Sequence, residues 1–95
     1  MIDLVSLFEK YGDEYLEFQS VENRYSNRPD LHAFNLLDTL LPGHTDIVSA
    51  AGHGEIWLEV DALELAEVAT EEQILELIRC GVRYNKEYEL LAMFV

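Results

Sequence analysis

The sequence predicts an α+β fold in which about four short helices pack on a small, mostly antiparallel sheet. Helical segments with capping signals alternate with apolar runs too short to be helices. The clearest of these runs, Ile56 to Val60, alternates apolar and polar residues as a half-buried strand does. Because 49% of the 95 residues are apolar, they suffice for one core, and we expect a single domain (1–95).

The first helix is expected to begin after Asp3, a good N-cap, and to end near Gly12. Residues 13–21 admit two interpretations, a continued helix or a strand. The turn signal at Gly12 favours the strand or extended form. Residues 22–27 are polar and rich in asparagine, which predicts a loop.

Pro29 begins the second predicted helix, because proline suits the first helical turn, and residues 41–43 (Leu-Pro-Gly) end it. Residues 47–51 favour a short strand, although Asp46 could instead cap a short helix there. Residues 52–54 (Gly-His-Gly) have the composition of a hairpin connection to the strand that follows.

The last third of the chain carries the strongest local signals. Two capping boxes, at residues 61–64 and 70–73, predict the starts of two helices. Gly81 supplies a left-handed cap at the end of the second helix. Residues 82–84 and 89–95 then flank a polar turn, as the two strands of a hairpin do.

The charge distribution sets this chain apart. It contains nineteen acids and six bases, giving a formal net charge of −13, and no Lys or Arg lies between Arg28 and Arg79. Such a field repels nucleic acid and anionic membranes and attracts basic surfaces. The same acidity would also keep a small protein soluble, so solubility alone is the simpler interpretation.

Four blocks of the sequence, at residues 28–34, 55–58, 79–84 and 91–94, resemble a small acidic protein family of tailed phages and prophages. The resemblance spans most of the chain and includes no nucleotide, metal or catalytic motif. It implies a phage or prophage origin. Small acidic phage proteins often bind and block host machinery, which by analogy favours an interaction role.

We therefore expect a non-enzymatic interaction protein that docks on a basic host or defence protein, such as one that binds nucleic acid. Carboxylates would then stand in for phosphates, as in a DNA mimic. The expected partner-binding residues are the acids from the central strand to the last helix: Glu55, Glu59, Asp61, Glu64, Glu67, Glu71, Glu72 and Glu76.

No cofactor, direct nucleic-acid contact or membrane contact is expected. The longest apolar run has six residues, far fewer than the roughly 20 that span a bilayer. The N-terminus lacks the basic region of a secretory signal, and the chain has a single cysteine. These features predict a cytoplasmic protein, in the host cell if it is phage-encoded.

Two enzymatic alternatives rest on histidine. His44, Asp46 and His53 are the residue types of a two-histidine, one-carboxylate metal site. His32 and Cys80 could form a catalytic dyad, but no motif surrounds either residue. Because Cys80 ends an apolar helix, we expect it to be an inert buried thiol, and we expect no enzyme.

The order of two helices followed by a hairpin, from Asp61 onward, is that of a winged helix-turn-helix. The second of these helices begins with Glu71 and Glu72, and carboxylates facing DNA phosphates would weaken binding. DNA binding is therefore not expected.

A structural alternative is self-association through the apolar C-terminal strand, residues 90–95. If this strand lies at a sheet edge, its unpaired backbone groups can pair with a second copy, with Leu91, Met93 and Phe94 in the contact. If it lies beside residues 56–60 in the middle of the sheet, it belongs to the core instead.

Overall fold

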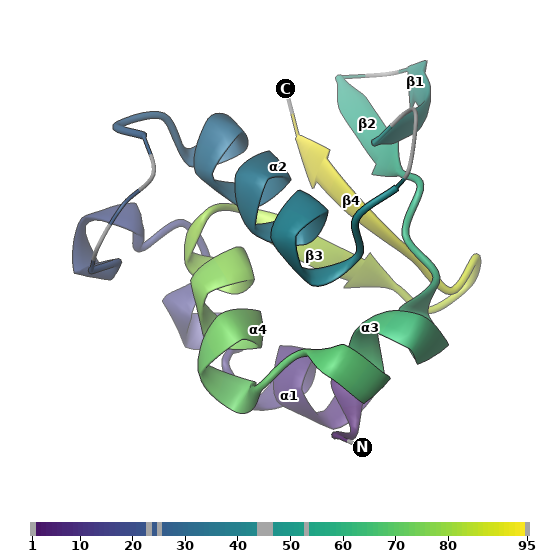
Figure 1. The fold of residues 1–95 in the computed structure, drawn as a ribbon, viewed down its shortest axis with the longest axis horizontal. Coiled ribbons are helices and arrows are strands. Elements are labelled where there is room, and N and C mark those ends of the chain that lie inside the picture. The colour runs from purple at the N-terminus through teal and green to yellow at the C-terminus, as the bar shows by residue number, and fades with distance from the viewer. Residues whose placement is uncertain (1, 23, 25, 44–46, 53, 95) are drawn as a thin grey trace.

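The computed structural model describes residues 2–22, 24, 26–43, 47–52 and 54–94, and confirms the α+β class (Figure 1). The four helices are α1 (Leu4–Lys10), α2 (Pro29–Leu40), α3 (Ala62–Val68) and α4 (Glu71–Arg79). One antiparallel sheet contains β1 (Val48–Gly52), β2 (Glu55–Leu58), β3 (Val82–Asn85) and β4 (Leu90–Phe94).

The helices begin where the capping residues predict. The Asp3 carboxylate accepts from a backbone N–H of the first turn of α1 at 3.2 Å. Thr70 and Gln73 form the complete capping box of α4, with bonds of 3.2 and 2.8 Å. Asp61 accepts from two backbone N–H groups at the start of α3. These side chains satisfy N–H groups that have no partner inside a helix, which fixes where each helix starts.

Residues 13–21 form neither the favoured strand nor a continued helix. Two 3₁₀ turns, Gly12–Glu14 and Phe18–Ser20, occupy most of the segment. Between them Leu16 adopts a left-handed φ of 65°, and its N–H donates to the Ile78 carbonyl of α4 at 3.2 Å. The strand prediction was wrong because short-range backbone bonds and α4 satisfy this segment, which has no neighbouring strand.

Strands β1 and β2 form the predicted hairpin, with Gly52 opposite Glu55. The connecting His53 lies outside the described residues. The short-helix alternative for residues 47–51 is wrong, because β1 begins at Val48 and pairs with β2; Asp46, its expected cap, also lies outside the described residues.

The strand order β1-β2-β4-β3 places the C-terminal strand β4 in the middle of the sheet. Both of its edges are paired, with β2 on one side and β3 on the other, so the edge position considered for this strand is wrong. Leu91 and Met93 are buried in the core, whereas Phe94 is 62% exposed. The free edges of the sheet are instead those of β1 and β3.

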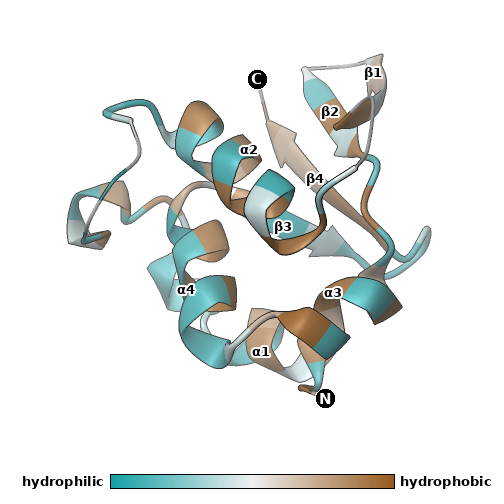
Figure 2. Cartoon of the chain, viewed as in Figure 1, coloured by the Kyte–Doolittle hydropathy of each residue, from teal (hydrophilic) through white to brown (hydrophobic). Residues whose placement is uncertain are grey.

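The core lies between one face of the sheet and the four helices (Figure 1). Hydrophobic and hydrophilic residues alternate around each helix in Figure 2, so each helix has an apolar side to bury. The core residues are Leu4, Leu7, Ala33, Leu36, Leu37, Leu58, Val60, Leu65, Ala66, Ala69, Ile74, Leu77, Ile78, Cys80, Val82, Leu91 and Met93. Across the described ranges, no helix is long and apolar enough to cross a membrane.

Replacing Gly81 at the end of α4 is predicted to destabilise the folded protein. The φ of Gly81 is +99°, and a Cβ atom there would lie 2.8 Å from the Leu16 Cδ2 atom. Gly81→Ala should therefore lower the free energy of unfolding by about 1–2 kcal/mol from backbone strain, while the exposed Leu16 side chain can turn away from the added methyl group. Urea denaturation measures the change. Gly12→Ala is the matched control, because its Cβ would meet nothing within 4 Å and its φ is not left-handed. A Gly81→Ala protein as stable as this control would contradict the prediction.

Candidate protein-binding surface

Two of the eight predicted docking acids have basic partners within the protein. Glu55 on β2 forms an ion pair with Arg83 on β3, and its side chain is only 14% exposed. Glu71 lies 3.3 Å from the Lys10 amine and accepts a hydrogen bond from the Tyr11 hydroxyl. The Tyr11 hydrogen bond, together with Lys10, holds the pKa of the Glu71 carboxyl below its usual value. These carboxylates therefore contribute to tertiary structure.

A third acid, Glu76, faces the interior. Its Oε2 atom lies 3.2 Å from Nε2 of His32, a side chain of α2 that is 1% exposed. The imidazole and the Phe18 ring pack in a T-shaped arrangement, with centroids 5.9 Å apart. This contact ties α2 to α4 through a polar group within the core.

Cys80 is the inert buried thiol that the sequence predicts. Burial, reinforced by the negative charge of Glu76, raises the pKa of the thiol from 9.0 to about 12. At neutral pH the group is a protonated thiol, which is a poor nucleophile. A His32–Cys80 dyad would lack the thiolate that such chemistry requires.

The other five predicted acids are exposed, and they form no ion pair with another described residue. Asp61 caps α3, and the remaining four are Glu59, Glu64, Glu67 and Glu72. Five of the six bases are paired with other carboxylates, and the sixth, Arg24, lies over the Phe18 ring. The exposed acids therefore keep an uncompensated negative field.

Helix α3 places two of these acids beside exposed apolar side chains. Glu64 and Glu67 lie one turn apart, and Leu63 and Val68 are 70% and 48% exposed. The opposite side of the helix buries Leu65 in the core. We call Leu63, Glu64, Glu67 and Val68 the α3 face.

Sequence reasoning identified the acids of the α3 face but missed its apolar half. A signal was present, because Val60 before the Asp61 cap and Leu65 in the helix have the spacing of a hydrophobic staple, which turns Leu65 inward. Helical spacing then turns Leu63 toward solvent.

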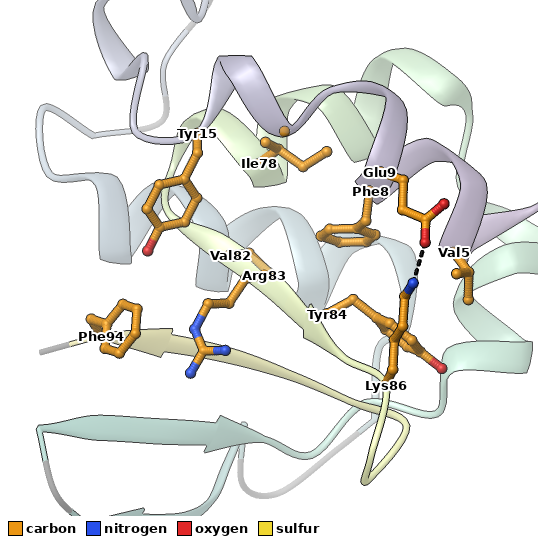
Figure 3. A pocket seen from close by; sticks show the side chains of 11 residues that line it. Val5, Phe8, Glu9, Tyr15, Ile78, Val82, Arg83, Tyr84, Lys86 and Phe94 are labelled. Atoms are coloured by element: carbon orange, nitrogen blue, oxygen red, sulfur yellow. Dashed lines mark hydrogen bonds and ion pairs between the residues drawn. The ribbon is translucent and has the colours of Figure 1, made fainter.

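Hollows lie beside the start of α3 and between α1 and β3. One, of about 450 Å³, lies beside the start of α3, where Leu63 and Asp61 meet Tyr88 and Glu89 of the β3–β4 turn. It extends the mixed acidic and apolar character of the α3 face. The second, of about 340 Å³, lies between α1 and β3 (Figure 3). We call this second hollow the α1–β3 groove.

No group of three His, Cys, Asp or Glu side chains in the described part of the chain is arranged to hold a metal ion. The residues considered for such a site, His44, Asp46 and His53, lie outside the described residues. Comparison of the chain with known protein families, curated proteins and solved structures finds no match. The resemblance to phage and prophage proteins therefore stays a prediction from the sequence blocks alone.

In the native protein, Cys80 should resist a thiol reagent such as DTNB at pH 8. A rise in pKa from 9.0 to about 12 lowers the thiolate fraction about a thousandfold, and burial blocks the reagent as well. The measurement compares labelling rates without urea and in unfolding urea. Equal rates in the two conditions would contradict the assignment of Cys80 as a structural residue.

Proposed function

We propose that this protein is a non-enzymatic binding protein whose α3 face docks on a basic surface of another protein. The observation that carries the proposal is the combination of two carboxylates that pair with no described residue, Glu64 and Glu67, with the exposed Leu63 and Val68 on one helix. Binding surfaces characteristically join apolar contact area to charged groups that select the partner.

The charge of the α3 face favours a cationic partner. Because the bases of this protein are engaged elsewhere, a Lys or Arg of the partner meets these carboxylates without competition from an internal cation. Long-range attraction to a chain of net charge −13 accelerates encounter, and this effect weakens as salt is added.

The apolar half of the face distinguishes binding from simple solubility. Acidic side chains alone keep a protein in solution, whereas exposed Leu63 and Val68 work against it. Their position beside Glu64 and Glu67 suits a partner that offers apolar and basic groups together. The exposed carboxylates also oppose pairing of this face with its own copy.

A host or defence protein that binds nucleic acid fits this chemistry, because its Lys and Arg side chains are arranged to meet phosphates. Carboxylates on one helix could occupy those positions in place of phosphates. This choice of partner rests on the predicted phage or prophage origin as well as on charge.

Reversing the charge of the α3 face should abolish capture of the partner. We compare pull-downs from host-cell lysate at low salt. The amount of partner recovered with the Glu64→Lys/Glu67→Lys variant should be lower than with the unchanged protein by a factor of about ten or more. The control is Asp13→Lys/Asp38→Lys, which changes two exposed, unpaired acids and alters the net charge equally. Equal loss in both variants would mean that only overall charge matters.

Zero-length carbodiimide coupling of the captured complex then locates the contact. The expected products join Glu64 or Glu67 to lysines of the partner, and capture should decline as salt is raised. Products concentrated at Asp13 or Asp38 would overturn the assignment to the α3 face. A lysate that yields no salt-sensitive partner would leave solubility as the role of the acidity.

A further inference from the structure

The α1–β3 groove runs beside a free strand edge, on different elements from the α3 face. Figure 3 shows Tyr15 and Phe94 at one end of the groove and Val5 and Lys86 at the other. Phe8 of α1 and Ile78 of α4 line it between these ends. The lining is predominantly apolar, and the groove follows the length of β3.

Strand β3 ends the sheet order, so one side of its backbone faces no strand. Among the described residues, no backbone hydrogen bond joins residues 83–85 to a segment outside the β3–β4 ladder. Four residues of strand extend about 13 Å. An unpaired edge of this length can receive another extended segment, and α1 supplies a wall beside it.

The other edge strand, β1, offers no comparable wall. All five of its residues are exposed. Its pairing is irregular near Ser49, whose hydroxyl donates to the Trp57 carbonyl at 3.2 Å. Such irregularities discourage a further strand from pairing.

The electrostatics of the groove select an uncharged occupant. Lys86 pairs with Glu9 across the groove, and Arg83 pairs with Glu55, so the charges cancel in pairs. Within a protein of net charge −13, this groove is therefore locally neutral. A charged segment would find no unpaired opposite charge here, whereas an uncharged segment buries no unpaired charge on entering.

The Arg83 side chain turns across β4, away from the free edge of β3. Its guanidinium lies 4.3 Å from the centroid of the Phe94 ring, and its Nε atom is buried without a hydrogen-bond partner in the described structure. A segment at the edge therefore hydrogen-bonds to the backbone of β3 and not to this side chain.

We propose that an uncharged, extended peptide segment of a partner protein binds the α1–β3 groove by adding a fifth strand to β3. Its main chain pairs with the free edge, and one apolar side chain enters the space lined by Phe8 and Ile78. Alternation of apolar and small polar residues in the segment fits one buried and one exposed side.

The probe is a pool of capped heptapeptides in which serine and threonine alternate with valine, isoleucine, leucine or phenylalanine. Binding to the ¹⁵N-labelled full chain should shift amide signals of β3 and α1 and slow hydrogen exchange in β3. Methylating alternate peptide nitrogens should weaken binding for one set of positions and spare the other, because only every second N–H faces the edge.

Two glycine variants provide a further test and its matched control. Gly12 lines the groove with open space at its Cβ position, so Gly12→Leu should fill the groove and weaken binding at least about tenfold. Gly52→Leu on β1 has equally open space and should leave binding unchanged. The Glu64→Lys/Glu67→Lys variant should also bind normally, which separates this result from the test of the α3 face.

Two outcomes would overturn the proposal. One is a pool in which no peptide shifts β3 signals at millimolar concentration. The other is equal binding of both sets of N-methylated peptides, which would mean that the groove holds an apolar side chain without strand addition.

Discussion

Burial of the apolar side of α4 is the constraint on which the rest of the structure depends. Ile74, Leu77 and Ile78 are almost fully buried, and α4 contacts α1, α2, β3 and both 3₁₀ turns. A complete capping box fixes the start of this helix and the left-handed Gly81 fixes its end. With both ends defined, α4 has one orientation in which its apolar side faces the core. The other helices pack around it.

The acidic composition serves two purposes that sequence alone does not separate. Glu55, Glu71 and Glu76 each contact a residue distant in the chain, so part of the negative charge stabilises the tertiary structure. Glu64 and Glu67 form no ion pair with another described residue and contribute to the negative field of the surface. Which acids are paired and which are not depends on where the six basic side chains lie in the fold. Only the fold brings Lys10 to Glu71 or Arg83 to Glu55.

Elements with local signals were predictable, and elements defined by distant contacts were not. The cap at Asp3, the box at Thr70 and the turn at Gly81 act within a few residues, and they placed the helix boundaries correctly. Residues 13–21 depend on α4, far along the chain, and were assigned wrongly. The central place of β4 likewise depends on pairing with β2 across more than thirty residues, which no local pattern encodes.

The strand order has a consequence for biosynthesis. Strand β4 separates β2 from β3, yet it is translated after both of them. Until β4 emerges from the ribosome, β2 has only β1 as a neighbour and β3 has none. A two-stranded hairpin has little stability by itself, so the four-stranded sheet cannot form strand by strand during translation. The apolar side chains of β2 and β3 therefore stay exposed until their shared partner arrives, and chaperones have their opportunity to act in that interval.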